Sequence, residues 1–220
     1  MKYVGIRPIL VHGGGPEITE FLKKVGKETM FVSGLRVTDE ETVEIAEMVL
    51  VGKLNSEIVS LLNLRGVRAV GLSGKDAGLI RARRKNAVVY EEGTARSVDI
   101  GSVGEVAAID TEIIIDLLNC GYVPVISPIG MGESGESYNI NADDVAAEIA
   151  GALHAEKLLL LTDVEGVYRD FADRSSLISQ LHFAQAREYI RSGVIAGGMI
   201  PKVEACLRAL EAVSYTHLRA

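Results

Sequence analysis

The chain contains 220 residues, 48% of them hydrophobic, and its 30 acidic and 23 basic side chains give a net charge of -7. This length supports a sizeable buried core, and the negative charge disfavours binding to nucleic acid or to an anionic membrane surface. We therefore expect the partners to be small molecules.

Cysteine usage and hydropathy indicate a protein of a reducing compartment. Only Cys120 and Cys206 occur, far apart and without metal-ligand spacing, so neither a disulfide framework nor a zinc site is predicted. The longest apolar runs, such as Ile113 to Leu118, end far short of the roughly 20 residues that a membrane span needs. Nothing near Met1 resembles a signal peptide. We expect a cytoplasmic protein that spans no membrane and has no protein-built metal site.

In chain order, short apolar runs rich in β-branched residues alternate with longer segments of helical periodicity. The short runs predict buried strands, at Ile6 to Val11, Ala69 to Leu72, Tyr122 to Ile126 and Lys157 to Thr162. The periodic segments predict helices, at Pro16 to Val25, Glu40 to Leu64 with a break near Gly52, Thr111 to Leu118, Asp143 to Leu153, Ala184 to Ser192 and Lys202 to Ala212. This alternation predicts an α/β fold with a mainly parallel sheet and helices on both faces.

The segment from Leu79 to Val106 differs from this alternation. Leu79 to Arg83 and Ala87 to Glu91 lie on either side of a basic turn, a pattern typical of antiparallel ribbons, so we expect a projecting β-hairpin flap. No internal repeat, low-complexity tract or proline-rich linker divides the chain. We therefore predict a single domain without an internal boundary.

The strongest local signal is the sequence Val-His-Gly-Gly-Gly-Pro from Val11 to Pro16. A buried strand here runs into three glycines and a proline at the first helical turn. Glycines let the backbone approach a ligand closely, and the free N–H groups of a helix start face an anion. We predict a phosphate or carboxylate site, with a merely tight strand-to-helix turn as the alternative. For His12 we favour a packed, hydrogen-bonded residue over a catalytic one.

Two glycine-containing patterns resemble nucleotide motifs but lack their context. Gly130 to Gly135 has the spacing of a dinucleotide fingerprint, yet no helix opens at its last glycine, so we expect a flexible loop. Gly52-Lys53 and Gly74-Lys75 are followed by neither Ser nor Thr. A P-loop enzyme is therefore disfavoured.

Three further segments carry polar groups suited to anions, and each has a structural alternative. Asn139, Asn141 and Asp143 gather at a predicted helix start, where helix capping explains one of them or even all three. Lys202 follows two glycines at another helix start, where its ammonium group could meet an anion or remain a solvated surface group. Arg36 lies in a turn-like stretch and suits a bidentate grip on a carboxylate.

Taken together, these segments resemble the amino-acid kinase family, and within it the branch that phosphorylates N-acetyl-L-glutamate. Six motifs carry the resemblance, in the family's order and approximate spacing. They start at His12 (His-Gly-Gly-Gly-Pro-Glu), Gly34 (Gly-Leu-Arg-Val-Thr-Asp), Gly71 (Gly-Leu-Ser-Gly-Lys-Asp), Tyr138 (Tyr-Asn-Ile-Asn-Ala-Asp), Leu160 (Leu-Leu-Thr-Asp-Val-Glu-Gly-Val) and Gly197 (Gly-Gly-Met-Ile-Pro-Lys-Val-Glu-Ala). The resemblance covers residues 2–212, nearly the whole chain.

The resemblance implies a three-layer αβα sandwich that binds the acyl amino acid toward the N-terminal half and ATP, with Mg2+, toward the C-terminal half. The implied reaction is phosphorylation of the γ-carboxylate of N-acetyl-L-glutamate in arginine biosynthesis, by a homo-oligomer. By similarity, the substrate would bind at Gly14, Gly15, Arg36 and Asn139. Catalysis would rest on Lys202, which stabilises the transferring phosphoryl group, and on Asp143, which holds the active-site lysines in position. The nucleotide would bind at Asp163, Val164, Gly166, Val167, Tyr168, Gly197, Gly198 and Met199.

Such a reaction needs positive charge rather than a general base, because the attacking carboxylate is already ionised. Lysines, Mg2+ and oriented backbone N–H groups hold the carboxylate and the γ-phosphate in line and neutralise both. The lack of an obvious histidine or aspartate base in the motifs therefore agrees with the implied reaction.

Both ends of the chain depart from the family pattern. Family members begin with a strand that carries a lysine and a glycine pair, and no such strand precedes Lys2. We therefore expect a fragment whose catalytic lysines are reduced to Lys202, with turnover lowered by about 10² to 10³. The tail, residues 213–220, does not align with the family, so the predicted domain comprises residues 1–212.

Two rival functions stay open from the sequence. One is a sister kinase that acts on an aminoadipyl group, a free amino acid, carbamate or UMP. The other is a non-catalytic fragment that binds a nucleotide or arginine, for which the missing lysine strand is the motivation. A substrate panel separates the first rival, and ligand binding without turnover would identify the second.

Overall fold

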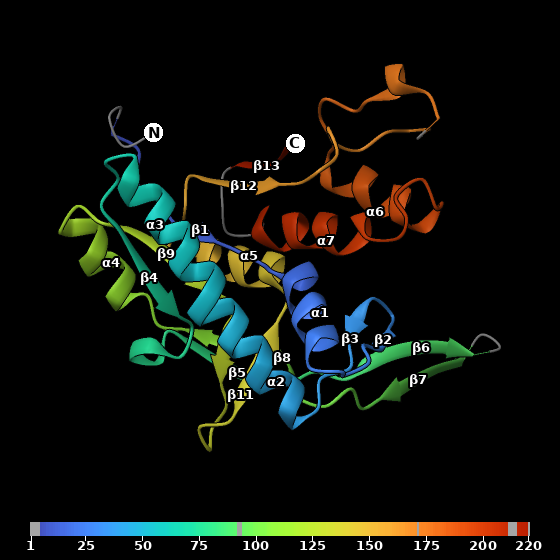
Figure 1. The fold of residues 1–220 in the computed structure, drawn as a ribbon. Helices are drawn as coiled ribbons and strands as arrows, with labels where there is room; N and C mark the ends of the chain where they lie inside the picture. Colours follow the sequence, from blue (N-terminus) through green and yellow to red (C-terminus); the bar gives the residue numbers. More distant parts are fainter. Residues whose placement is uncertain (1–4, 92–93, 171, 211–214, 220) are drawn as a thin grey trace. The chain divides into compact units, whose positions relative to one another are not determined.

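The computed structural model describes residues 5–91, 94–170, 172–210 and 215–219 (Figure 1). The chain divides into two compact units, residues 1–145 and 146–220, and each is described by itself. The sequence analysis drew no internal boundary. The division falls inside helix α5 (Ala142–Ala152), where neither a linker nor a change of composition marks it. The single domain at residues 1–212 stays a prediction.

A parallel sheet with the strand order β1-β9-β4 forms one part of the first unit. Its strands are β1 (Leu10–Val11), β9 (Val123–Ser127) and β4 (Ala69–Ser73). The middle strand, β9, is buried along its whole length. The strand predicted from Ile6 is shorter than expected and starts at Leu10. Pro8 has no N–H to donate to a neighbouring strand, which explains the late start.

Three helical segments follow one another without an intervening loop in the first unit. They are α2 (Glu40–Glu47), the π-helix η2 (Met48–Asn55) and α3 (Ser56–Leu64). The break predicted near Gly52 falls inside η2, so it takes the form of a change in helix type rather than an interruption. The other helices of this unit are α1 (Gly15–Lys24), η3 (Asp76–Gly78) and α4 (Glu112–Asn119).

Four strands of the first unit close into a small barrel in the order β10-β11-β8-β5. They are β10 (Ile129–Met131), β11 (Ser137–Ile140), β8 (Val103–Ile109) and β5 (Ile80–Arg84). The flexible loop predicted at Gly130 to Gly135 is wrong, because this segment belongs to the β10–β11 hairpin. Gly130 pairs with Tyr138, and the Gly132 N–H donates to the Glu136 carbonyl at 2.9 Å.

Two more hairpins belong to the first unit. One joins β2 (Phe31–Val32) and β3 (Leu35–Arg36), and the other joins β6 (Ala87–Glu91) and β7 (Thr94–Val98). The β6–β7 hairpin extends away from the rest of its unit and is the predicted flap (Figure 1). β5, which the sequence placed in the same ribbon region, pairs with β8 instead of with β6.

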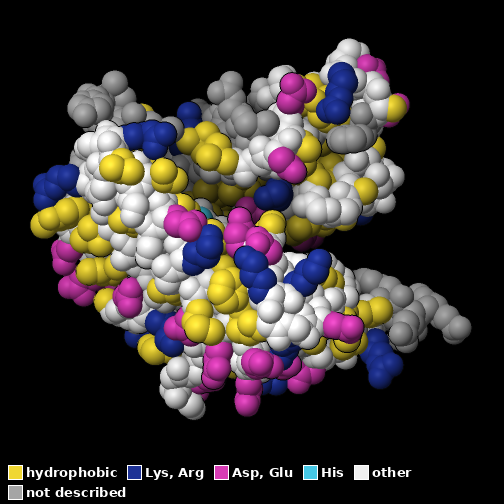
Figure 2. Space-filling view, in the orientation of Figure 1, with side chains coloured by type: hydrophobic (Ala, Val, Ile, Leu, Met, Phe, Trp, Pro, Cys, Tyr) yellow, Lys and Arg dark blue, Asp and Glu magenta, His cyan; other side chains and the backbone are white. Residues whose placement is uncertain are grey.

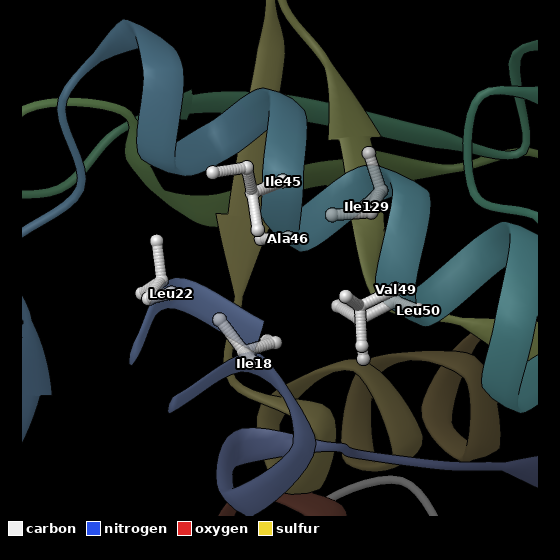
Figure 3. Close-up of a cluster of buried hydrophobic side chains, with 7 residues drawn as sticks. All are labelled: Ile18, Leu22, Ile45, Ala46, Val49, Leu50 and Ile129. Carbon is white, nitrogen blue, oxygen red and sulfur yellow. The ribbon is translucent and has the colours of Figure 1, made fainter. Parts of the chain in front are cut away.

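A hydrophobic cluster holds α1 against α2, η2 and the barrel (Figure 3). Its buried members are Ile18, Leu22, Ile45, Ala46, Val49, Leu50 and Ile129. Full burial of an aliphatic side chain of this size contributes roughly 1.5–3 kcal/mol. The cluster therefore fixes the start of α1, and with it the glycine turn that leads into this helix.

The second unit contains the parallel pair β12 (Lys157–Leu161) and β13 (Tyr215–Arg219), with η4 (Arg174–Ser176), α6 (Phe183–Arg191) and α7 (Met199–Leu210). β12 was predicted to be fully buried, but its burial alternates: Leu158 and Leu160 are buried, whereas Leu159 and Leu161 are exposed. The buried pair packs against alanines of α5 and α7.

Helix α7 begins three residues earlier than the predicted start at Lys202. Pro201 does not prevent this, because the N–H groups of a first turn have no partner within the helix. The predicted end at residues 211–212 lies outside the described residues. Parallel pairing of short strands between helices is present in both units, so the predicted α/β class is confirmed.

Candidate active site

The glycine turn, residues His12 to Gly15, joins β1 to α1 in the first unit. The His12 N–H donates to the Ile126 carbonyl at 3.2 Å and so ties the start of the turn to β9. Gly14 caps α1, and Pro16 lies in the first turn of this helix, as the sequence predicts. A Cβ at Gly14 would lie 2.2 Å from Leu54 Cδ1, whereas a Cβ at Gly15 would meet nothing within 4 Å. The turn is therefore packed at Gly14 and open at Gly15.

His12 is a packed residue, as the sequence analysis favoured. Its Nδ1 lies 2.9 Å from the Gly13 carbonyl oxygen and its Nε2 lies 3.1 Å from Asn55 Nδ2. A carbonyl only accepts, so Nδ1 carries the proton and Nε2 accepts from the Asn55 amide. Burial lowers the pKa of His12 below its ordinary value of 6.5, which agrees with a neutral ring.

Arg36, at the end of β3, is buried beside the glycine turn with only 7% of its surface exposed. Its Nη2 donates to the Gly15 carbonyl at 2.9 Å and to Thr19 Oγ1 at 2.8 Å. The guanidinium carbon lies 4.8 Å from the ring centroid of Phe31. Nη1 is buried and has no hydrogen-bond partner among the described residues. Such a group lacks the compensation that buried donors need, and a carboxylate would supply it.

Backbone hydrogen bonds connect Asn139 to the strand that carries Arg36. Thr38 follows this strand, and its carbonyl accepts from the Ser102 N–H at 2.6 Å. The Ser102 carbonyl in turn accepts from the Asn139 N–H at 3.0 Å. The structure thus brings the predicted substrate residues Gly14, Gly15 and Arg36 together, and places Asn139 on a strand tied to the same segment.

Asn141 and Asp143 occupy the start of α5. Asn141 Oδ1 accepts from the N–H groups of Asp143 at 2.8 Å and Asp144 at 3.2 Å, so Asn141 is the capping residue. Asp144 forms an ion pair with Lys85, at 3.3 Å between Oδ2 and Nζ. Capping therefore accounts for Asn141, and the catalytic role of Asp143 stays a prediction.

The second unit has a cavity of about 440 Å³. It is lined by Thr162, Asp163, Val164, Gly166, Val167, Tyr168, Val194, Ile195, Ala196, Gly198, Met199 and Lys202. Every residue of this unit that the sequence assigned to nucleotide binding or catalysis lines the cavity, except Gly197. Lys202 is the fourth residue of α7, so its ammonium group belongs to the first turn of this helix.

The loop that lines one side of this cavity is held by polar and ring contacts. Tyr168 Oη donates to a carboxylate oxygen of Glu165, and the Arg174 guanidinium lies 5.3 Å from the Tyr168 ring centroid. Gly166 has a φ of +152° and lies close to Leu177, a conformation that favours glycine. These contacts fix Tyr168 at the cavity wall.

Sequence reasoning missed several residues of both regions. Thr162 and the apolar run from Val194 to Ala196 line the cavity, and the glycines at both ends of that run were the available signal. In the first unit, Asn55 was missed, because it lies among other polar residues, Lys53, Ser56 and Glu57, and nothing local distinguishes it from them. Within the described ranges, no group of three or more His, Cys, Asp or Glu side chains could hold a metal ion. None of the described helices is long and apolar enough to cross a bilayer.

Comparison with known proteins shows a family match that spans almost the whole sequence. The amino acid kinase family model matches residues 1–218, which includes most of the tail that the sequence analysis could not align. An acetylglutamate kinase from Symbiobacterium thermophilum is 58% identical over 211 residues, covering 96% of this chain and 71% of the relative. An acetylglutamate kinase from Pelotomaculum thermopropionicum is 56% identical over 220 residues, covering 99% and 75%.

Solved structures show the same fold. A crystal structure of a Streptococcus mutans UA159 protein superposes with a TM-score of 0.82 at 27% identity, covering 100% of this chain and 88% of the other. Carbamate kinase from Giardia lamblia bound to AMP-PNP has a TM-score of 0.63 at 14% identity, covering 100% and 81%, and supports the fold alone. The six ordered motifs, the α/β architecture and a family match through residue 218 lead to one assignment: the chain belongs to the amino acid kinase family.

Proposed function

We propose that this chain catalyses the ATP-dependent phosphorylation of N-acetyl-L-glutamate on its γ-carboxylate, giving N-acetyl-L-glutamyl 5-phosphate and ADP in arginine biosynthesis. The observation that carries the proposal is the identity of 58% and 56%, over nearly the whole chain, to relatives named acetylglutamate kinase. The buried Arg36 beside an open glycine turn and the cavity around Lys202 support it.

The first unit would bind the acyl amino acid. Arg36 would donate from Nη1 to the α-carboxylate, because this buried donor has no partner among the described residues. The backbone N–H groups of Gly14 and Gly15 lie at the start of α1, where the helix dipole favours an anion. Asn139 would contact the amide-bearing end of the substrate.

The second unit would bind ATP. Its cavity of about 440 Å³ lies within the size range of ligand pockets, roughly 300–1,000 Å³, and combines apolar walls with Lys202 and with Gly198, which directly precedes α7. Asp163, Val164, Gly166, Val167, Tyr168, Gly197, Gly198 and Met199 would hold the nucleotide. Mg2+, when bound with ATP, supplies charge neutralisation at the phosphates, and kinases usually hold it with few protein ligands.

The roles of Lys202 and Asp143 follow from the charge balance of the reaction. The γ-carboxylate is already ionised and attacks the γ-phosphorus, the bond to the ADP oxygen breaks, and no proton has to be removed. Lys202 would stabilise the negative charge on the transferring group, and Asp143 would hold lysine ammonium groups in position. The neutral, internally hydrogen-bonded His12 fits a reaction that uses no imidazole base.

A homo-oligomer in the cytoplasm is part of the proposal. Helix α3 has no buried residue although most of its side chains are apolar, and Leu61 and Leu64 are exposed. Hydrophobic side chains gather at the surface over α3 and α4 (Figure 2). Exposed apolar surface of this kind supports self-association. Light scattering after size exclusion should give a dimer or a larger species, and a monomer alone would contradict this part of the proposal.

A substrate panel scored by ADP release tests the reaction. With ATP and Mg2+ present, N-acetyl-L-glutamate should stimulate ADP release more than N-acetyl-L-aminoadipate, L-glutamate, carbamate or UMP. Faster release with the aminoadipyl compound would reassign the chain to a sister kinase. Calorimetric binding of both ligands without ADP release would identify a non-catalytic binding module instead.

A further inference from the structure

The π-helix η2 packs against the glycine turn. Extended π-helical segments are rare, and π-bulges occur frequently at functional sites, because the wider turn changes the direction of the side chains. In η2, Leu54 Cδ1 and Leu50 Cδ2 would lie 2.2 and 2.8 Å from a Cβ at Gly14. The side chains of the π-helix thus rest directly on the backbone of the turn.

Asn55, the last residue of η2, joins this helix to two strands of the parallel sheet. It is only 4% exposed, and its Nδ2 donates to the Val125 carbonyl of β9 at 2.9 Å. The same Nδ2 donates to His12 Nε2 at 3.1 Å, at the end of β1. On the other side, Asn55 Oδ1 would lie 1.9 Å from a Cβ at Gly71 in β4, so only glycine fits opposite it.

His12 transmits this contact to the turn. Its Nδ1–H donates to the Gly13 carbonyl at 2.9 Å, so the orientation of the ring fixes the peptide between Gly13 and Gly14, which carries the Gly14 N–H. The Asn55 amide holds the other ring nitrogen and thereby selects the Nδ1–H tautomer. Without this donor, the Nε2 of the half-buried His12 ring would lose its partner and the ring could turn.

We propose that Asn55 is a positioning residue that acts through His12 to hold the glycine turn in the conformation that presents the Gly14 and Gly15 N–H groups to an anion. The identity of that anion, N-acetyl-L-glutamate, rests on the proposed function; the positioning of the turn does not. The competing explanation is that Asn55 only fastens η2 to the sheet. The two explanations differ in what happens at the glycine turn when the side chain is changed.

Two substitutions and one matched control separate these explanations. Asn55→Asp replaces the amide donor by a carboxylate that only accepts, so His12 Nε2 has to donate, and Asn55→Ala removes the donor without adding charge. Asn63→Asp is the control, because Asn63 lies in α3 and makes two hydrogen bonds to the backbone of Ala69, at the opposite end of β4. Asn63 is exposed whereas Asn55 is buried, so the two substitutions can differ in their cost to stability. The free energy of unfolding of each variant is therefore measured with urea, beside the two readouts below.

The first readout needs no ligand. In the wild-type chain, ¹⁵N NMR should show that His12 is the Nδ1–H tautomer. Finding the Nε2–H tautomer would overturn the proposal, and this measurement does not depend on whether any Asn55 variant folds. In both Asn55 variants the amide resonances of Gly13 to Gly15 should move, and in Asn55→Asp the pKa of His12 should rise, because a carboxylate then faces the ring. Asn63→Asp should leave these signals in place.

The second readout is ligand binding by calorimetry. The Asn55 variants should bind N-acetyl-L-glutamate roughly 10- to 100-fold more weakly, because a displacement of binding groups by about 1 Å has an effect of this order. The affinity of Asn63→Asp should stay within about twofold of wild type. Unchanged turn resonances and affinity, together with lowered stability, would show that Asn55 is merely structural. If the wild-type chain does not bind N-acetyl-L-glutamate, the proposed function fails, and the NMR result still decides the role of Asn55.

Discussion

At the scale of single residues, Arg36 makes the sharpest prediction about substrate binding. The guanidinium Nη2 donates to two groups of the protein, the Gly15 carbonyl and Thr19 Oγ1. Nη1 has no partner among the described residues and could donate to a substrate carboxylate. Lysine cannot keep both the inner contacts and the outer one. Arg36→Lys should therefore weaken N-acetyl-L-glutamate binding roughly 10- to 100-fold, the value of a charged hydrogen bond, as measured by calorimetry.

Arg68 offers the matched control for this change. Its guanidinium lies 4.1 Å from the Tyr122 ring centroid, and its Nη1 donates to a backbone carbonyl at 3.4 Å, yet the residue is exposed and distant in sequence from the glycine turn. Arg68→Lys should change the affinity by no more than about twofold. Equal losses in both variants would mean that Arg36 acts on general stability and not on the substrate.

His12 predicts a pH dependence of stability with a definite sign. Burial lowers its pKa in the folded chain below the ordinary value of 6.5, so the unfolded chain binds more protons just below pH 6.5. The stabilising contribution is complete above this value and is lost as the pH falls through the folded-state pKa. Urea unfolding between about pH 7.5 and pH 5.5 should show a steeper loss for wild type than for His12→Gln, and parallel curves would refute the assignment.

At the scale of elements, the start of α2 depends on Asp39. Its Oδ1 accepts from the Thr42 N–H at 2.8 Å, and its Oδ2 lies 2.8 Å from Lys27 Nζ. These hydrogen bonds lower the pKa of Asp39 from 3.8 to about 2, and the bond from Lys27 has the largest effect. The carboxylate thus contributes stability above pH 3.8, and this contribution is lost as the pH falls toward 2.

The cap and the ion pair of Asp39 can be separated by two substitutions. Asp39→Asn keeps a capping oxygen and removes the exposed ion pair, whereas Asp39→Ala removes both. Helix caps are worth about 1 kcal/mol and exposed pairs little, so alanine should cost about 1 kcal/mol of unfolding free energy and asparagine only a few tenths. Chemical denaturation at neutral pH measures the free energy of unfolding of both variants. If Asp39→Asn and Asp39→Ala lose the same amount, the ion pair and not the cap dominates.

At the scale of the whole molecule, the proposal assigns the two ligands to different units. Lys202→Met should weaken binding of a non-hydrolysable ATP analogue and lower turnover by about 10² to 10³, while leaving the affinity for N-acetyl-L-glutamate within about twofold. Arg36→Met should weaken binding of N-acetyl-L-glutamate and leave the affinity for the ATP analogue within about twofold. Calorimetry with each ligand alone tests this. A properly folded variant that loses both ligands equally would contradict the separate assignment.

Much of this molecule follows from the order of its amino acids. The helices and strands alternate as periodicity predicts, because apolar spacing reports which face of an element is buried. The family resemblance placed one set of residues at the nucleotide and the transferring phosphoryl group, and all of them except Gly197 line one cavity: Asp163, Val164, Gly166, Val167, Tyr168, Gly198, Met199 and Lys202. Their roles stay a prediction. Glycine and proline indicated the turn before α1, because proline suits a first helical turn and the packing of Leu54 leaves no room for a Cβ at Gly14.

The sequence could not determine which side chains meet across the fold. Asn55 and His12 are 43 positions apart, and their contact depends on a π-helix that no local pattern predicted. Arg36 Nη1 is buried without a partner among the residues that the structure describes, because β3 carries Arg36 against the start of α1. Gly130 lies in a hairpin rather than a loop because β11 supplies a partner strand. Local preference selects each element, whereas burial and pairing between distant segments decide the geometry of a site.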